Sequence, residues 1–222
     1  MRINPVFLFD LDGTLVDSDA GHLAAYRRVF APHGVALSHA DYVTRIMGAS
    51  NEAVAQAFLS HLPKASQSET LAAKERAYRD NLGALEAIAG AAALLDFADA
   101  HALRRAVVTN APRENAELIL TAIGLGDRLP IRVIASELAR SKPDPLPYLT
   151  ALELTGAGAE HSLAFEDSLS GVRSAFAAGL AVVGLTTSLE ADRLIEVGAS
   201  IAVADFTDPR ICALIESRMP PR

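Results

Sequence analysis

The sequence predicts an α/β protein, with a doubly wound parallel sheet and an all-helical segment inserted after its first strand. From residue 84 onward, short apolar runs typical of buried strands alternate with helical periodicities, which is the pattern of β-α units. Residues 19–82 instead carry one helical pattern after another. Half of the 222 residues are apolar, so the chain can bury a large core and global disorder is excluded.

The first predicted strand ends in two carboxylates. Residues 6–9 are aromatic or branched and read as a buried strand, and Asp10, Asp12 and Gly13 follow directly. Residues i and i+2 of an extended chain face the same side, so both carboxylates can point into one small space. Like charges placed that close repel, which favours a chemical use or a counter-ion over a merely solvated acidic turn. Gly13 permits the chain to turn sharply there.

The remaining elements follow in order along the chain. Within the insertion, Ser50 is expected to cap the third helix and Pro63 to end it. The helices expected there span residues 19–30, 41–47, 51–62 and 68–82. The later strands are expected at 104–109, 131–135, 163–165, 181–185 and 201–203, and the later helices at 91–100, 113–123, 146–154, from after 167 to 178, 189–197 and 209–217.

Ligands of such sheets collect at the carboxyl ends of the strands, where this chain places polar pairs. Thr109 and Asn110 offer a hydroxyl and free N–H groups that suit a phosphate oxygen, although Thr109 is equally a cap for the next helix. Glu166 and Asp167 end a later strand; facing the first acidic pair they form a site for a hard cation such as magnesium, or one of them is a helix cap. The convergence of these pairs predicts one site.

Lys142 stands in the proline-flanked turn Ser-Lys-Pro-Asp-Pro, which restricts its backbone. A lone lysine is usually a solvated surface charge. A site that holds four carboxylates and a phosphate dianion, however, needs positive charge. Lys142 is the residue predicted to supply it.

Net charge and composition limit the classes of partner and the cellular location that we expect. The formal net charge of −7 argues against a nucleic-acid surface, which would carry a basic stripe. The leading residues are too short for a signal peptide or a membrane span. The single cysteine, Cys212, cannot form an internal disulfide, and its neighbours Ile211 and Leu214 suggest a buried helical thiol. We expect a soluble cytoplasmic protein, a monomer or a weak dimer.

Four strings together resemble the motifs of the haloacid dehalogenase-like (HAD) hydrolase superfamily. FDLDGTLVDS resembles the first motif, VVTN the second, KPDP the third and FEDSLSG the fourth, in the right order. The insertion after the first motif resembles the helical cap of the β-phosphoglucomutase/phosphoglycolate phosphatase-like subfamily. The resemblance implies a Rossmann-like catalytic core of residues 1–17 and 84–222 and a helical cap of residues 18–83.

The resemblance also implies roles for the motif residues. Asp10 would be the nucleophile that forms an aspartyl-phosphate, and Asp12 the general acid and then base. Thr109, the Asn110 backbone and Lys142 would hold the phosphoryl oxygens. An acid at position 12 argues against dehalogenase activity, because an ester leaving group needs a proton and a halide does not.

The metal implied by the resemblance is Mg²⁺. Its ligands would be the Asp10 carboxylate, the Asp12 carbonyl, Asp167, and Glu166 directly or through water. In-line phosphoryl transfer needs mainly positioning and charge neutralisation, which this set of residues supplies.

In the expected cap, His22 and Lys74 stand where the mutase branch has a histidine and a lysine that serve proton transfer and substrate contact. Each has a plain alternative, an ordinary polar position for His22 and an exposed helix charge for Lys74. Asn51 stands where that branch has an arginine that grips the substrate's far phosphate. An amide carries no charge and cannot form a bidentate fork, which lowers the mutase interpretation.

The leading prediction is therefore a magnesium-dependent phosphatase of a small phosphomonoester, a sugar phosphate or phosphoglycolate. The alternative enzyme is a phosphomutase of the β-phosphoglucomutase type. A phospho-acceptor receiver domain also clusters aspartates, magnesium and a lysine, but it has about half this length and no helical insertion. A binding protein that is catalytically silent is disfavoured by intact acids in the motifs.

Overall fold

The computed structural model describes residues 5–218, and within them the chain forms one six-stranded, fully parallel sheet. Its strand order, β3-β2-β1-β4-β5-β6, is that of a doubly wound Rossmann-like sheet, so the predicted fold class is confirmed. The strands are β1 (Val6–Phe9), β2 (Arg104–Thr109), β3 (Ile131–Ile134), β4 (Leu163–Glu166), β5 (Ala181–Leu185) and β6 (Ile201–Val203).

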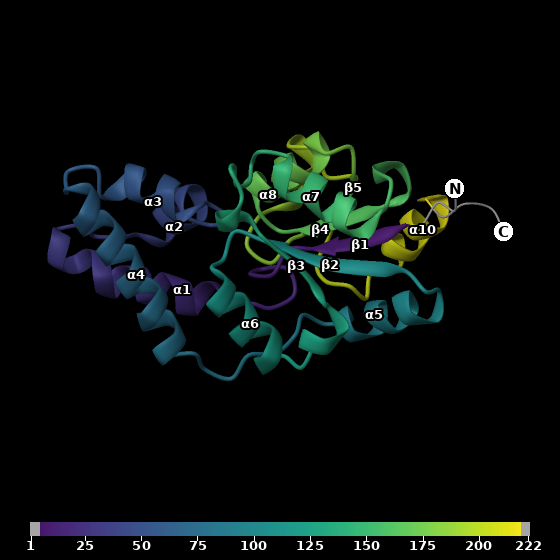
Figure 1. Ribbon diagram of the computed structural model, residues 1–222, viewed down its shortest axis with the longest axis horizontal. Coiled ribbons are helices and arrows are strands. Elements are labelled where there is room, and N and C mark those ends of the chain that lie inside the picture. Colours follow the sequence, from purple (N-terminus) through teal and green to yellow (C-terminus); the bar gives the residue numbers. More distant parts are fainter. Residues whose placement is uncertain (1–4, 219–222) are drawn as a thin grey trace.

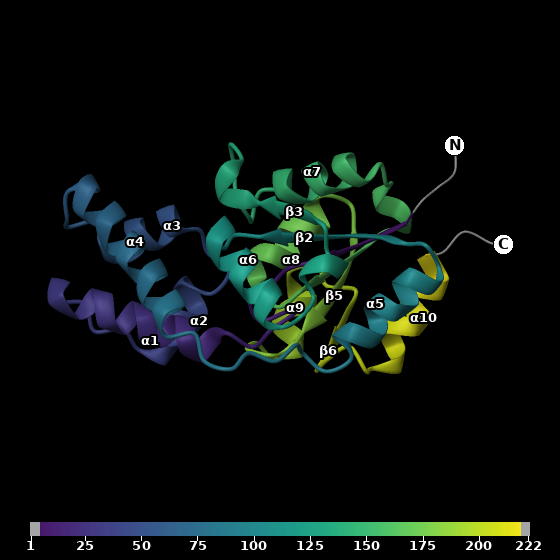
Figure 2. The same ribbon diagram turned by 60° about the horizontal axis from the view of Figure 1, so that its bottom comes forward.

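Four of the helices between β1 and β2 lie beside the sheet, beyond the end of β1, and not on either of its faces (Figures 1 and 2). We call them the cap helices: α1 (Asp19–Phe30), α2 (His39–Arg45), α3 (Asn51–Phe58) and α4 (Lys64–Asp80). The other helices are α5 (Ala91–Ala100), α6 (Arg113–Ala122), α7 (Leu146–Thr155), α8 (Leu169–Ala177), α9 (Ala191–Glu196) and α10 (Pro209–Arg218). Short 3-10 turns occupy Ala31–His33, Gly126–Arg128, Ala135–Glu137 and Ala159–His161.

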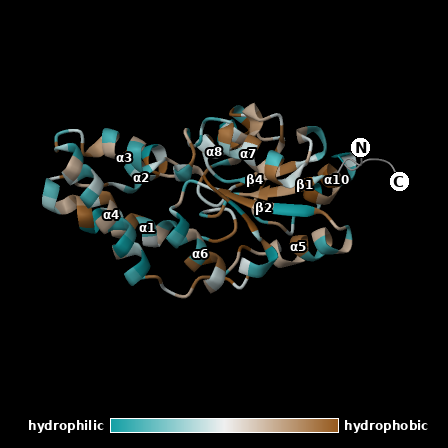
Figure 3. Ribbon diagram, viewed as in Figure 1, coloured by the Kyte–Doolittle hydropathy of each residue, from teal (hydrophilic) through white to brown (hydrophobic). Residues whose placement is uncertain are grey.

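Both faces of the sheet are buried, which explains why its strands are mostly apolar, apart from charged residues such as the two arginines at the start of β2 (Figure 3). Successive residues of a strand face opposite sides. Phe7 and Phe9 of β1 therefore pack in one cluster with residues of α5, α6 and α10, whereas Val6 and Leu8 pack with residues of α7, α8 and α9. The cap helices bury a third cluster of their own, around Tyr26 and Phe30.

The predicted boundary between the third and fourth helices is wrong by about one turn on each side. The third helix, α3, ends at Phe58 instead of residue 62, and α4 begins at Lys64 instead of residue 68. Pro63 is the N-cap of α4, since proline suits the start of a helix as well as it stops one. The amide of Gln67 in the first turn of α4 donates to the Leu62 carbonyl at 2.8 Å and thereby helps to hold the reversal.

The prediction of a buried Cys212 is also wrong, because this thiol is exposed on α10. Ile211 and Ile215 are the buried residues of that helix. Each helical residue is rotated by about 100° from the one before, so the residue after Ile211 points away from the core. Among the helices of residues 5–218, none combines the length and the apolar character needed to cross a bilayer.

Candidate active site

The loop after β1 brings acids from two neighbouring strands together. Asp10 is 8% exposed, and its backbone N–H donates to the Phe165 carbonyl of β4 at 3.0 Å. Gly13 has a φ of +77°, and a Cβ on it would lie 2.1 Å from Oδ2 of Asp167. Only glycine allows both this backbone angle and this approach, so Gly13 is what lets the first acidic loop close on the β4 acids.

The carboxylates of Asp10, Glu166 and Asp167 form a buried cluster, with one oxygen of each within 4.8 Å of the others. Burial raises the pKa of Asp10 to about 7, against the lowering effect of Lys142. Burial and the charges of Asp10 and Glu166 raise the pKa of Asp167 well above its usual value. Because buried like charges require a cation, and hard oxygen donors are the ligands that Mg²⁺ prefers, this cluster fits the predicted magnesium ion.

The Asp12 carboxylate lies outside that cluster and points towards the cap helices. Its Oδ1 accepts hydrogen bonds from the Ser18 hydroxyl at 2.5 Å and from Nε2 of His22 at 3.1 Å. Burial by itself would raise the pKa of Asp12, but His22 and Ser18 hold it below its usual value. The two acids of the first motif therefore have different surroundings, one facing the acidic cluster and the other facing a histidine.

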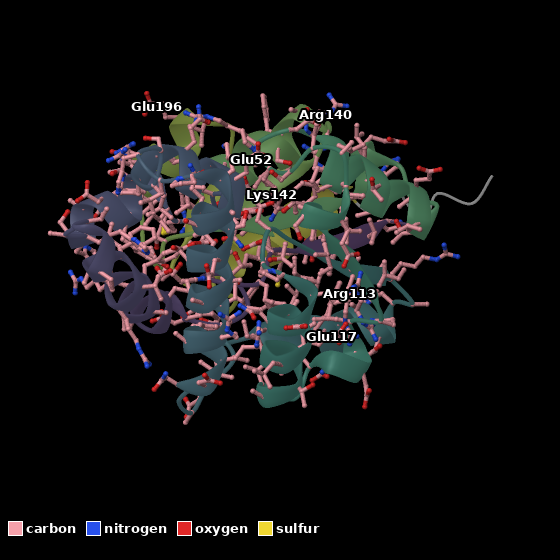
Figure 4. The ribbon with its side chains drawn as sticks, turned by 60° about the vertical axis from the view of Figure 1, so that its left-hand side comes forward. Glu52, Arg113, Glu117, Arg140, Lys142 and Glu196 are labelled. Atoms are coloured by element: carbon pink, nitrogen blue, oxygen red, sulfur yellow. The ribbon has the colours of Figure 1, made fainter. Side chains whose placement is uncertain are left out.

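Lys142 lies in the interior and not at the surface, so its interpretation as a solvated charge is wrong (Figure 4). Its ammonium donates to Oδ1 of Asp10 at 2.6 Å, to Oε1 of Glu166 at 2.5 Å and to the Val108 carbonyl at 2.6 Å. Burial disfavours the ammonium, but the carboxylates of Asp10 and Glu166 outweigh it and raise the pKa of Lys142. Lys142 is thus the predicted counter-charge of the acidic pair.

Thr109 and Asn110 line the space in front of Asp10 at the end of β2. The hydroxyl of Thr109 accepts the N–H of Ala111 at 3.0 Å, so it closes a local turn. The alternative in which Thr109 caps the next helix is wrong, because α6 begins with Pro112 as its N-cap. The side-chain amide of Asn110 instead reaches the cap helices' connecting loop, donating to the Gly48 carbonyl at 2.9 Å.

Neither acid of the fourth motif is a helix cap. Ser168 is the N-cap of α8, and its hydroxyl accepts the N–H of Gly171 at 3.0 Å. Glu166 and Asp167 are therefore free of the structural role that the sequence left open for them. Within the described chain, Oε1 of Glu166 is held by Lys142 and by the phenol of Tyr148, at 2.5 and 2.6 Å.

The predicted cap residues face the same space. Lys74 is 3% exposed, so its interpretation as an exposed helix charge is wrong. Its ammonium contacts Nδ1 of His22 at 2.9 Å and Oε2 of Glu75 at 3.1 Å. The Asn51 amide donates to Oε1 of Glu75 at 3.1 Å. His22 and Lys74 thereby form a connected pair beside Asp12.

A pocket of about 80 Å³ separates the cap helices from the sheet. Its lining residues include both acids of the first motif, the two predicted phosphate-binding residues at the end of β2 and the predicted cap contacts; these are Asp10, Asp12, Thr109, Asn110, His22, Asn51 and Lys74. Ligand pockets for small molecules usually hold about 300–1,000 Å³. The space as it stands is therefore smaller than a phosphorylated sugar would need.

Sequence reasoning missed residues that shape the site, among them Glu75 and Tyr148. Glu75 had a detectable signal, because it falls in the apolar stripe of α4 between Leu71 and Tyr78, where a carboxylate is out of place. Tyr148 had none, since a tyrosine on a helix next to a sheet is an ordinary core residue. Only the packing of α7 against the sheet brings its phenol to Glu166.

Comparisons with known proteins agree with this geometry. The haloacid dehalogenase-like hydrolase family matches residues 7–185. The chain is 34% identical over 209 residues to a validoxylamine A 7'-phosphate phosphatase of Streptomyces hygroscopicus subsp. limoneus, covering 92% of this chain and 95% of that one. It is 33% identical over 208 residues to a phosphoglycolate phosphatase of Rhodospirillum rubrum, covering 90% and 86%. A hydrolase from Pseudomonas syringae superposes with a TM-score of 0.87 at 24% identity, over 97% of this chain and all of that one.

The family match covers the four motifs and the inserted helices between the first and the second. The relatives match over nearly the whole chain, and both are phosphatases by name. The buried cluster of three acids and one lysine lies at the strand ends where the motifs predicted it. The chain therefore belongs to the haloacid dehalogenase-like hydrolase family, in its phosphoglycolate phosphatase and β-phosphoglucomutase branch, as a phosphoric monoester hydrolase.

Proposed function

We propose that this chain is a magnesium-dependent phosphatase that hydrolyses a small phosphomonoester, of the sugar phosphate or phosphoglycolate class, through an aspartyl-phosphate on Asp10. A cytoplasmic monomer or weak dimer is the form in which we expect it to act. The relatives' names support the substrate class, since one is a validoxylamine A 7'-phosphate phosphatase and the other a phosphoglycolate phosphatase.

The observation that carries the proposal is the buried contact of Lys142 with both Asp10 and Glu166, beside a pocket that Asp10 lines together with Thr109 and Asn110. A carboxylate with an ammonium on one side and further carboxylates on the other is suited to attack phosphorus while charge is neutralised around it. Magnesium bound by Asp10, Glu166 and Asp167 and the Asp12 carbonyl would offset the phosphate's charge.

In the proposed reaction a carboxylate oxygen of Asp10 attacks phosphorus, and the bond from phosphorus to the leaving oxygen breaks. Asp12 gives that oxygen its proton. In the second half, Asp12 takes a proton from water, the water oxygen attacks phosphorus, and the Asp10–phosphorus ester bond breaks to release phosphate. Lys142, Thr109 and the Asn110 backbone hold the phosphoryl oxygens during both transfers.

The proposal includes a division of labour between residues 18–83, as a cap, and residues 1–17 and 84–222, as the catalytic core. Because the present pocket holds about 80 Å³, substrate entry requires the cap helices to move away from the sheet. Contacts that join the two parts, such as Gly48 to Asn110 and His22 to Asp12, would re-form over bound substrate and exclude water.

Removal of the metal provides the first test. Phosphate release should be measured over sugar phosphates, phosphoglycolate and nucleotides, with magnesium and after chelation. We expect release from at least one small phosphomonoester and a fall of about 100-fold or more on chelation, because metal-ion catalysis contributes several kcal/mol to such transfers. Restoration by Mg²⁺ is the control for damage by the chelator. Equal rates with and without the metal would contradict the proposal.

A phosphomutase is the second candidate, favoured by the His22–Lys74 pair beside Asp12. Asn51 disfavours it, because the amide is neutral and is already bound to Glu75. Among the described residues that line the pocket, Lys74 is the only lysine or arginine, and its ammonium is already paired with Glu75. A second phosphate would thus find no free cation there.

Asn51→Arg tests this distinction. The new guanidinium should lower KM for a sugar bisphosphate about tenfold relative to the monophosphate, because hydrogen bonds to a charged group contribute about 1.5–3 kcal/mol. Asn51→Gln, which adds length without charge, is the matched control and should leave the ratio unchanged. Isomerisation by the wild type that depends on a bisphosphate activator, with little phosphate released, would favour the mutase instead.

A further inference from the structure

Asn115 is a buried residue of α6, and its side chain forms hydrogen bonds with one of the cap helices, α4. It is fully buried, its Nδ2 donates to Oε2 of Glu75 at 2.7 Å, and its Oδ1 accepts from Nη1 of Arg79 at 2.7 Å. Glu75 and Arg79 both belong to α4. An amide is the side chain that can donate to a carboxylate and accept from a guanidinium at the same time, so aspartate or leucine could not replace both contacts.

Glu75 connects Asn115 to two other residues that line the pocket. Its Oε2 also accepts from the Lys74 ammonium at 3.1 Å, and its Oε1 accepts from the Asn51 amide at 3.1 Å. A buried carboxylate is stable when its oxygens are satisfied in this way, and it becomes costly when a donor is removed. The position of Glu75, and with it that of Lys74, therefore depends on Asn115.

Lys74 in turn fixes the direction of the hydrogen bond between His22 and Asp12. Its Nζ lies between Oε2 of Glu75 and Nδ1 of His22, and both of these atoms can act as acceptors. When Nδ1 accepts, the ring proton is on Nε2, which lies 3.1 Å from Oδ1 of Asp12. The Tyr78 ring stacks on the imidazole at 3.8 Å between centroids and holds its plane.

These contacts form an unbroken series from α6 to the general acid: Asn115, Glu75, Lys74, His22, Asp12. We propose that Asn115 is a positioning residue that links the seating of the cap helices on the core to the orientation of His22 against Asp12. The inference rests on the proposed function. When α4 leaves α6 to admit substrate, Asn115 loses both partners, and the donor that faces Asp12 is no longer fixed. The general acid, Asp12, is thus held in its working orientation only while the site is closed.

The test compares two substrates in one variant. Asn115→Leu keeps the size of the side chain and removes both hydrogen bonds. The ratio of kcat/KM for an alkyl phosphate to that for p-nitrophenyl phosphate reports protonation of the leaving oxygen, because nitrophenolate leaves with little help from an acid. We expect kcat/KM for the alkyl phosphate to fall about tenfold further than that for the aryl phosphate, part of the roughly 10²–10⁴-fold that general acid–base catalysis contributes. A residue that only stabilises the fold would lower both equally.

Two further variants make the result specific. Asn115→Leu in a Glu75→Gln background should change the ratio little further, because both substitutions break the same series of contacts. Glu114→Gln removes the neighbouring Arg79–Glu114 ion pair of this interface, whose glutamate is exposed, and should leave the ratio at its wild-type value. If Asn115→Leu does not fold, Asn115→Asp takes its place, since it keeps the size and the Arg79 contact but repels Glu75.

A second readout is independent of turnover. The ¹⁵N chemical shifts of the His22 ring should show the Nε2–H tautomer in the wild type and a mixture in the Asn115 variant. An equal fall for both substrates, or an unchanged His22 spectrum in the variant, would overturn the inference while leaving the phosphatase proposal intact. Absence of phosphate release from either substrate by the wild type would instead refute the proposed function, and the inference would fall with it.

Discussion

Asp10→Asn is expected to abolish phosphate release while the protein stays folded. The amide oxygen carries no full negative charge, so the attacking group at the end of β1 is lost. Removal of a nucleophile costs enzymes several orders of magnitude in kcat, and we expect a loss of about 10⁴-fold or more. Phosphate release under saturating substrate and Mg²⁺ measures it.

The fold should tolerate this change, because Asp10 shares a buried space with Glu166 and Asp167. Burial already raises the pKa of Asp10 to about 7 although Lys142 lies beside it, so its charge is not favoured there. Asparagine has the same shape, and its oxygen can still accept from the Lys142 ammonium. The midpoint of thermal unfolding without metal should therefore stay the same or rise.

The covalent intermediate gives this prediction its control. With ³²P-labelled p-nitrophenyl phosphate, whose leaving group needs little help from an acid, and an acid quench, Asp12→Asn should retain label on the protein, because it can still accept the phosphoryl group but activates water poorly. Asp10→Asn should retain none. Hydrolysis near the wild-type rate, or label on Asp10→Asn, would contradict the assignment of the nucleophile.

The strands could be predicted closely because their signals are local. Residues 104–109, 181–185 and 201–203 form strands with the predicted limits, and each contains an apolar run that is buried in the sheet. Once the strands are parallel, their carboxyl ends meet at one edge, which is why Asp10, Thr109 and Glu166 could be placed together in advance. Resemblance to a family supplied their roles, and the geometry of the cluster is consistent with those roles.

The helical half of the site could not be predicted in the same way. Asn115 and Tyr148 reach the site because α6 and α7 pack on the sheet with particular faces inward. The rotation of each helix about its axis, which decides the inward face, is set by contacts with residues distant in sequence. Cys212 shows the same limit, since a shift of one residue along α10 separates a buried position from an exposed one. Local pattern identifies a helix more securely than it identifies the neighbours of each side chain.

Lys142→Met should have the largest effect on stability. Methionine matches the lysine in length, but it leaves Asp10 and Glu166 without the ammonium that now lies 2.6 and 2.5 Å from them. Breaking a buried ion pair by removing one partner costs about 3–5 kcal/mol. For a chain of this size, that is a fall of roughly 6–20 °C in the midpoint of thermal unfolding. Scanning calorimetry in a metal-free buffer measures it, and phosphate release should also be lost.

A second substitution shows whether repulsion among the carboxylates is the cause. Glu166→Gln removes one of the charges that Lys142 neutralises, and its amide can still accept from the Tyr148 phenol. Lys142→Met combined with Glu166→Gln should therefore be more stable than Lys142→Met alone, although it carries one more substitution in the core. A cavity effect would instead make the double variant as unstable as the single one, or less stable.

Magnesium should partly rescue Lys142→Met if the acidic cluster binds it, because a ligand that binds the native state raises the free energy of unfolding. The rise in unfolding midpoint on adding Mg²⁺ should be larger for Lys142→Met than for the wild type, in which the lysine already offsets part of the charge. It should be smaller in the double variant, which lacks a ligand. No change of midpoint in any of the three proteins would count against a divalent cation at Asp10, Glu166 and Asp167.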